Sequence, residues 1–174
     1  MKKQNKTKQA VKLHEGKTMY IIFLVMFIAL LVVIDQLTKF AAINAKQLQL
    51  GFFCLKKAFN YGVSFGLLNI NNVFIFALVI AISLAVIFAC FAFIFMQVKK
   101  QARFNLFVLA LCLLLAGTIS NLIDRLAFNY VRDFIGFCYF AFPSFNLADL
   151  FNVTAVLILV VIWVKTRRET FIYA

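Results

Sequence analysis

"VFIFALVIAISLAVIFACFAFIFM", residues 73–96, contains no charged side chain and no Gly or Pro, and Ser83 is its only hydroxyl-bearing residue. The hydrocarbon core of a bilayer is about 30 Å thick, and a helix of roughly 20 apolar residues crosses it once. The stretch is long enough for such a crossing and carries no signal for a turn. It therefore predicts a membrane-spanning helix and a fold that is built in lipid.

Three further apolar runs have the same character. The predicted spans are residues 19–43, 73–96, 104–124 and 145–164. The first run could also be read as the apolar region of a secretory signal, but "LTKFAAI" continues it past Asp35, which favours a retained span. The whole chain is 65% apolar, whereas soluble domains are about half apolar. We therefore predict an all-α membrane protein with one four-helix domain over residues 19–168, a basic tail over 1–18 and a second tail over 169–174.

The basic residues gather beside the apolar runs and give a formal net charge of +12. Lysines are frequent in residues 1–18, and Lys and Arg recur in residues 97–103 and 165–168. By the positive-inside rule these segments face the cytoplasm. Such clusters are typical of topology signals and of contacts with membrane lipids, so nucleic-acid binding is not expected. The connections 45–72 and 125–144 then lie outside. We expect irregular or short β structure in the first, and we expect the second, which is rich in Phe and Tyr, to be a loop at the level of the lipid headgroups.

The four cysteines show no CxxC spacing. Cys90 and Cys112 lie inside apolar runs, and Cys54 and Cys138 lie in the two outer connections. The pattern favours buried or inert thiols over a metal site or a disulfide. A Cys54–Cys138 bridge stays open as an alternative if both connections face an oxidising compartment.

The aspartates are placed toward one side of the predicted membrane domain. Asp35, Asp124, Asp133 and Asp149 all fall at or near the outer ends of spans, and Asn121 and Asn146 stand three residues from two of them. Residues three or four apart share a helix face, so the polar groups are expected to converge between the helices. Such a cluster predicts a functional site.

The residue types limit the chemistry of this site. His14 is the only histidine and lies in the tail, which excludes a Ser/His or Cys/His nucleophile and a His-ligated zinc. An Asp pair that shares a proton could activate water, and Ser64 with Lys56 or Lys57 is a weaker alternative. A proton- or ion-coupled carrier and a non-catalytic scaffold are alternatives of other classes. Carriers, however, place such carboxylates near the membrane midplane on broken or repeated helices.

Five segments in order resemble the signature segments of the bacterial type II, or lipoprotein, signal peptidases. They are "DQLTK" (35–39), "NYGVSFG" (60–66), "GTISNLIDR" (117–125), "VRDF" (131–134) and "FNLAD" (145–149). The resemblance implies a monomeric multi-pass aspartic endopeptidase of the bacterial cytoplasmic membrane, with its active site near the outer face. Its substrates would be diacylglyceryl-modified prolipoproteins, cut before the lipidated cysteine, and it would need no metal or other cofactor.

The resemblance also assigns roles to residues. Asp133 and Asp149 would be catalytic, and the residues that support them or bind substrate would be Asp35, Lys39, Asn60, Gly62, Asn121, Asp124, Arg125, Asn146 and Ala148. The chain departs from the family pattern at Phe59, Val63, Ser64 and Ser120, which bears on substrate fit and loop packing and leaves the Asp pair intact.

The helix dipole distinguishes the acids. Asp149, near a helix N-terminus, is the natural ionised partner, and Asp133 on its loop is the protonated one. Asp124 at a helix C-terminus should need a cation, Arg125 or Arg132.

Overall fold

The computed structural model of the chain describes residues 2–63, 68–69, 73–100, 103–140 and 142–172. Its long helices are α1 (Lys2–Asn44), α2 (Val73–Lys100), α3 (Leu106–Phe128) and α4 (Leu147–Ile172). In this part of the chain each of the four is long and apolar enough to cross a membrane. The predicted class, a multi-pass helical membrane protein with a small β region, is confirmed.

Helix α3 lies at the centre of the bundle. More than half of its apolar window is buried inside the protein, against about a tenth for each of the other three helices. A core forms where α1, α2 and α3 meet, and it consists of Leu24, Cys90, Ile94, Val98, Val108, Leu111, Cys112 and Leu115. Lipid-facing helices need no polar outer face, which is why the outer sides of α1, α2 and α4 remain apolar and exposed. Because α3 lies at the centre, its polar side chains are enclosed by the neighbouring helices.

Helix α1 is longer than the predicted span. It has 43 residues and is therefore about 65 Å long, roughly twice the thickness of a bilayer core. Residues 2–18, the basic tail, form the first part of this helix, ahead of the membrane span. Lys17 Nζ donates a hydrogen bond of 3.1 Å to the carbonyl oxygen of Lys99, so the first two basic segments lie at the same end of the bundle.

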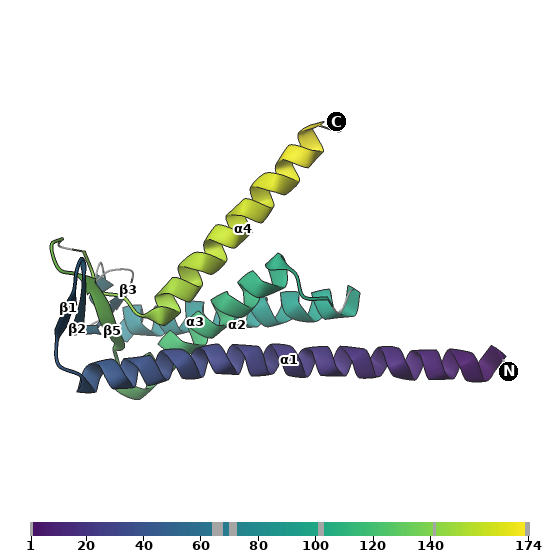
Figure 1. The fold of residues 1–174 in the computed structure, drawn as a ribbon, viewed down its shortest axis with the longest axis horizontal. Coiled ribbons are helices and arrows are strands. Elements are labelled where there is room, and N and C mark those ends of the chain that lie inside the picture. The colour runs from purple at the N-terminus through teal and green to yellow at the C-terminus, as the bar shows by residue number, and fades with distance from the viewer. Residues whose placement is uncertain (1, 64–67, 70–72, 101–102, 141, 173–174) are drawn as a thin grey trace.

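A three-stranded antiparallel sheet lies at the opposite end of the bundle, away from both termini (Figure 1). Its order is β1 (Leu48–Leu50), β2 (Phe53–Asn60), β5 (Val131–Phe137). Gly51, at φ 62°, makes the turn between β1 and β2, a conformation that glycine adopts without a steric penalty. A second small sheet pairs β3 (Gly62–Val63) with β4 (Leu68–Asn69).

Strand β5 corrects the sequence prediction, which placed Asp133 on a loop. The segment pairs with β2, and Asp133 lies opposite Ala58. Helix α3 passes beyond the predicted end at Asp124 and stops at Phe128, where Asn129 adopts φ 63° and donates its N–H to the carbonyl oxygen of Arg125. This left-handed C-cap ends the helix and turns the chain into β5. Asp133 is therefore held by a sheet.

A disulfide between Cys54 and Cys138 links β2 to the residue after β5. The two cysteines are 84 residues apart in sequence, and their Cα atoms are 5.3 Å apart, within the usual range for a disulfide. The favoured prediction of free thiols is wrong for this pair, because antiparallel pairing of β2 with β5 brings two distant connections together. It is right for Cys90 and Cys112, which are free and buried.

Candidate active site

Asp149 lies in the first turn of α4, where it is held by a reciprocal cap with Asn146. Asn146 Oδ1 accepts from the backbone N–H of Asp149 at 3.0 Å, and the backbone N–H of Asn146 donates to Asp149 Oδ2 at 3.1 Å. This is the geometry of a capping box, with Asn as the N-cap and an acid three residues later. The other oxygen of Asp149 accepts from Asn121 Nδ2 at 2.9 Å. The "FNLAD" segment therefore both starts α4 and fixes the position of the Asp149 carboxylate.

Asp133 reaches the same place from β5. Its Oδ2 accepts from Asn60 Nδ2 at 3.0 Å, and its Oδ1 accepts from Asn146 Nδ2 at 2.7 Å. Asn60 is the last residue of β2, two residues along from the partner of Asp133 in the ladder. The pairing of β2 with β5 thus positions both Asp133 and Asn60, which is one of the hydrogen-bond donors to its carboxylate.

Two of the amides have their orientation fixed by neighbouring groups that can donate hydrogen bonds but cannot accept them. Lys39 Nζ donates to Asn121 Oδ1 at 2.9 Å, so the amide nitrogen of Asn121 must face Asp149. The backbone N–H of Asp149 likewise occupies Asn146 Oδ1, so the amide nitrogen of Asn146 must face Asp133. Each carboxylate therefore receives at least one donor whose direction is set by a second layer of contacts.

An ionic network lies behind these amides. Lys39 and Asp35, which are fully buried, form an ion pair of 2.7 Å one helical turn apart on α1. Asp124, also fully buried, lies 3.4 Å from Lys39 Nζ and 2.6 Å from Arg132 Nη2. Arg132 is thus the cation predicted for Asp124. Asp35 Oδ1 accepts from the backbone N–H of Ala148 at 2.8 Å, which ties α1 to the start of α4.

Two residues of this network were missed as contributors. Gln36 Nε2 donates to Asp124 Oδ1 at 3.0 Å, and Gln36 Oε1 accepts from Arg132 Nη2 at 2.6 Å. Ser120, one of the departures from the family pattern, is buried and donates through Oγ to Asp35 Oδ2 at 2.6 Å. Gln36 stands inside the quoted "DQLTK" segment, so its position beside Asp35 was the available signal. Ser120 adds a bond to the network.

The departure at Phe59 is accommodated by aromatic packing. Phe59 lies opposite Arg132 in the β2–β5 ladder, and its ring meets Tyr130 edge-on at 4.9 Å between centroids. Val63, a further departure, pairs with Leu68 in the small second sheet. Neither residue touches the Asp pair through these contacts.

Asp133 is electrostatically unusual. Burial and, second, the charge of Asp149 raise the pKa of Asp133 to about 7. The hydrogen bonds from Asn60 and Asn146 and the charge of Lys39 act in the opposite direction and are outweighed. A carboxyl group with this pKa can hold a proton at neutral pH, which is a requirement for a general acid.

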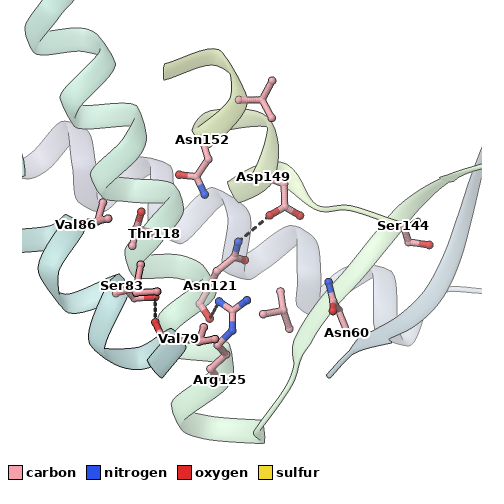
Figure 2. Close-up of a pocket in the computed structure, with 13 residues that line it drawn as sticks. Asn60, Val79, Ser83, Val86, Thr118, Asn121, Arg125, Ser144, Asp149 and Asn152 are labelled. Carbon is pink, nitrogen blue, oxygen red and sulfur yellow. Dashed lines mark hydrogen bonds between the residues drawn. The ribbon is translucent and has the colours of Figure 1, made fainter. Parts of the chain in front are cut away.

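A pocket of about 410 Å³ opens between α2, α3 and α4, and Asp149 is one of its lining residues (Figure 2). Its polar lining residues are Asn60, Ser83, Thr118, Asn121, Arg125, Ser144, Asp149 and Asn152, and Val79, Ile82, Val86, Val131 and Val153 complete it. Ser83, Thr118 and Asn152 had not been assigned to the site. Asn152 stands three residues after Asp149, and that spacing was the available signal for it.

Arg125 faces this pocket. Its Nη1 donates to the carbonyl oxygen of Asn121 at 3.4 Å, and its buried Nε has no hydrogen-bond partner among the described residues. Within that part of the chain it forms no ion pair with Asp124, which Arg132 binds. Arg125 therefore leaves donors available to a group that enters the pocket.

Gly62, Ser64 and Lys56 are the remaining predicted residues. Gly62 belongs to β3, where it pairs with Asn69. Ser64 lies outside the described residues. Lys56 packs its side chain over Gly136, whose missing Cβ leaves room for it. The Ser/Lys alternative thus gains no support from Lys56.

Comparison with known proteins places the chain in a family. The family described as Signal peptidase (SPase) II, peptidase A8, matches residues 27–165. The lipoprotein signal peptidase of Rickettsia bellii is 34% identical over 152 residues, which are 80% of this chain and 73% of that protein. The Clostridium tetani protein of the same name is 29% identical and is covered over 92% of its length.

Other matches are shorter or concern the fold. Alignments with the lipoprotein signal peptidases of Chlamydia felis and Chlamydia caviae, 38% and 40% identical, span 64% and 58% of those proteins. A bacterial membrane enzyme solved by the in meso method at 2.3 Å has a similar fold, with a TM-score of 0.72, 23% identity and coverage of 86% of this chain and 92% of that one. Because the family match spans most of the 174 residues and includes both acids and at least part of each of the four spans, the chain belongs to the signal peptidase II family.

Proposed function

We propose that this protein is an intramembrane aspartic endopeptidase that removes the signal peptide from diacylglyceryl-modified prolipoproteins, cutting on the N-terminal side of the lipidated cysteine. Family membership and the names of the relatives support the general activity. The assignment of the reaction to Asp133 and Asp149 rests on the geometry of the site.

One observation carries this assignment: a buried carboxylate from β5 and a half-buried one from α4 are linked through Asn146, and the second of them lines a pocket. Like charges held close together in a partly dry site do not both ionise readily, so the pair tends to keep one proton. Asp149 receives the backbone N–H of Asn146 at a helix N-terminus, which favours its ionised form. Asp133, with its pKa raised to about 7, is the member that holds the proton.

The reaction follows from this division of roles. Asp149 takes a proton from water as the water oxygen bonds to the scissile carbonyl carbon, and Asp133 gives its proton to the carbonyl oxygen. The tetrahedral intermediate, which carries two hydroxyl groups, then collapses: the C–N bond breaks, the leaving nitrogen takes the proton held by Asp149, and one hydroxyl returns its proton to Asp133 as the carbonyl re-forms. The products are a signal peptide with a new carboxylate and a lipidated cysteine with a free amino group.

The pocket lining is suited to such a substrate. Val79, Ile82 and Val86 of α2 give it an apolar wall, which matches the apolar segment of a signal peptide. Arg125, with its unpartnered Nε, is placed to donate to a carbonyl oxygen of the bound chain. Donors of this kind stabilise charge that develops on oxygen during acyl transfer.

Localisation and assembly are inferred from the same features. By the positive-inside rule, the basic segments support a cytoplasmic location for both termini, with the sheet and the Asp pair near the outer face of the cytoplasmic membrane. Both acids and their three amide donors come from one chain, so a monomer suffices for the reaction.

The test is a cleavage assay on detergent-purified protein. Two synthetic precursor peptides of identical sequence are compared, one with a diacylglyceryl group on its cysteine and one without. We expect one product pair from the lipidated peptide, cut before the cysteine, and little or none from the other. Absence of product from both, together with Asp-dependent ion flux in proteoliposomes, would support the ion-coupled carrier instead.

A further inference from the structure

A group of basic side chains lies at the end of the bundle opposite the sheet, where α1, α2 and α3 meet. Lys17 Nζ donates at 3.1 Å to the carbonyl oxygen of Lys99, so α1 and α2 are in contact at this level. Lys100 ends α2, and Arg103 follows in the connection to α3. The C-terminal end of α4, with its own basic residues, lies apart from this group (Figure 1). We call Lys17, Lys99, Lys100 and Arg103 the junction cluster.

The junction cluster has no acidic counterpart. Lys99, Lys100 and Arg103 are exposed, and Lys17 is partly exposed. Among the described side chains at this end of the bundle Glu15 is the only acid, and within that part of the chain no member of the cluster forms an ion pair. Like charges that are gathered without counter-charges repel one another. A bound anion removes that repulsion, so the cluster is complementary to a negatively charged group.

Aromatic rings lie next to the cations, on the side toward the middle of the membrane. The ring of Phe104 packs edge-on against Phe23 and Phe27 of α1, with centroid separations of 5.8 and 6.1 Å. Arg103 directly precedes Phe104 in the chain. Phe23 lies about 9 Å farther along α1 than Lys17, toward the sheet. Phe23 and Phe104 are exposed, so lipid can reach these three rings, which we call the ring surface.

Helix α2 shows the same order of charge and ring. Lys99 Nζ lies 4.4 Å from the centroid of the Phe95 ring, one turn earlier on the helix. Phe95 is itself exposed, so the cation rests on a ring that faces lipid. A cation over an aromatic face is attracted to it. The charge of Lys99 is therefore held at the end of the span, while the ring below it stays in the apolar layer.

This order along the helices selects the ligand. A free inorganic anion would bind the cations and leave the rings uncovered, and a soluble acidic protein cannot reach rings that lie within the bilayer. An anionic phospholipid has a phosphate for the cations and acyl chains for the rings. A zwitterionic phospholipid has the same chains, but it carries a cation that the cluster repels. Basic sites between membrane helices on the cytoplasmic side are suited to the headgroups of anionic lipids.

We propose that the junction cluster and the ring surface together bind one anionic phospholipid, whose phosphate contacts the cations and whose acyl chain lies on the rings. On the proposed topology this lipid belongs to the cytoplasmic leaflet. The lipid neutralises the cluster where three helices meet, so it stabilises their packing. The inference does not depend on peptidase activity, because the site lies at the opposite end of the bundle from Asp133 and Asp149.

The experiment measures lipid binding with one tryptophan placed in the ring surface. Trp163 is the only tryptophan of the chain, so Trp163→Phe removes the background signal and Phe104→Trp introduces the reporter. The full chain is reconstituted into vesicles that contain phosphatidylcholine and phosphatidylglycerol in varied ratio, with one of the two lipids brominated, because bromine quenches tryptophan fluorescence at short range. Both leaflets have the same composition, so the result is independent of the direction of insertion. The quenching gives the binding constant of phosphatidylglycerol relative to that of phosphatidylcholine.

We expect phosphatidylglycerol to bind about 5-fold more tightly than phosphatidylcholine at the Phe104→Trp reporter, which is roughly the effect of one basic side chain at a membrane surface. Lys17→Gln or Arg103→Gln, added to the reporter, should lower this preference to about 2-fold or less. The matched control is Lys46→Gln, the same loss of charge at an exposed position beyond the other end of α1, and it should leave the preference unchanged. A second reporter, Phe88→Trp, at an exposed position in the middle of α2, should show equal binding of the two lipids.

Each other outcome contradicts the proposal. Equal binding of the two lipids at the Phe104→Trp reporter overturns it. A preference of the same size at Phe88→Trp also overturns it, because it would reflect a general attraction of anionic lipid to the whole protein. If neither Lys17→Gln nor Arg103→Gln lowers the preference, the cluster is a topology signal only. Where Phe104→Trp does not fold, Phe95→Trp, beneath Lys99, replaces it as the reporter and is judged by the same outcomes.

Discussion

Asp133 and Asp149 accept hydrogen bonds from the same residue, Asn146, whose side chain donates to the first at 2.7 Å and whose backbone N–H donates to the second at 3.1 Å. The N-cap of a membrane helix is therefore also the spacer between two carboxylates. Because the cap forms whenever α4 forms, the separation of the pair does not depend on a mobile loop.

Replacing either acid by its amide should abolish cleavage. Asp133→Asn and Asp149→Asn keep the shape of the side chain but can neither take a proton from water nor share one. General acid–base help is worth about 10²–10⁴-fold, and groups that act as a unit lose nearly everything when either is removed. The measurement is the cleavage rate per mole of folded, membrane-inserted protein. An Asp133→Asn variant with near wild-type activity would remove Asp133 from the pair.

Asp124→Asn should act on folding. Asp124 is fully buried and binds Lys39, Gln36 and Arg132, so the amide leaves two buried cations short of a counter-charge. Removing one partner of a buried ion pair costs about 3–5 kcal/mol. We expect a marked loss of folded yield and thermal stability, with substantial activity in the fraction that folds.

The matched control for that experiment is Glu15→Gln, the same chemical change at an exposed position. It should leave yield and activity unchanged. A well-folded but inactive Asp124→Asn, beside an active Asp133→Asn, would instead identify Asp124 and Asp149 as the catalytic pair.

Cleavage should fall as the pH rises through about 7. The pKa of Asp133 is raised to about 7, chiefly by burial and then by the charge of Asp149, so its proton is lost there and the general acid disappears. The same shift affects stability. An unfolded Asp titrates near pH 3.9, so the stabilisation from holding this proton is full below about pH 4 and is lost as the pH rises through about 7. Initial rates between pH 5 and 9, corrected for the folded fraction, measure the effect.

Asn60→Ala tests the cause of that pH dependence. Asn60 donates to Asp133 Oδ2 and favours its ionised form, and Asn146, Lys39 and Arg125 are the other groups whose bonds or charges favour it. Loss of the Asn60 bond should raise the pKa of Asp133 and move the fall in activity to higher pH. A profile that stays in place, or moves to lower pH, would contradict the assignment of the titrating group.

Cleavage should survive chelation. Among the described residues, no group of three or more His, Cys, Asp or Glu side chains could hold a metal ion, and the carboxylate and amide oxygens that contact the two acids bind divalent metals weakly. Activity in EDTA should equal activity in buffer. Activity that EDTA removes and an added divalent metal restores would indicate a metallopeptidase.

The orientation of the chain in the membrane can be determined by labelling single cysteines. In a variant with its own four cysteines replaced, a cysteine at Lys57 in β2 should react with a membrane-impermeant thiol reagent added outside intact cells. A cysteine at Lys100, at the far end of α2, should react only after the membrane is opened. The reverse pattern would invert the topology, and cleavage activity of the cysteine-free background serves as the control for its fold.

The sequence predicted what depends on local composition. Residues 73–96 are apolar throughout, and α2 occupies Val73–Lys100 because a chain in lipid must satisfy its backbone within the segment. The spacing of Asn121 and Asp124, and of Asn146 and Asp149, placed each pair on one helix face, and the bundle does bring them together with Asp35. A resemblance in five ordered segments supplied the choice of Asp133.

The features that were missed depend on distant partners. Strand β5 forms because it pairs with β2, some 70 residues earlier, and its aromatic residues alone suggested a loop at the headgroup level. The Cys54–Cys138 bond depends on that pairing. Gln36 and Asn152 are single polar residues whose contacts are with other elements: Gln36 binds Asp124 of α3 and Arg132 of β5, and Asn152 packs against Gly117 of α3.

The Cys54–Cys138 bond also sets an order of biogenesis. Cys54 lies between the first and second spans and Cys138 follows the third, so the earlier thiol must wait through the synthesis and insertion of 84 further residues. During that interval β2, which ends at Asn60, lacks the strand with which it will pair. β2 can pair with β5, which carries Asp133, only after α3 has been made, and α4, which brings Asp149, comes last. Maturation of the enzyme is thus complete only when its final span has been inserted.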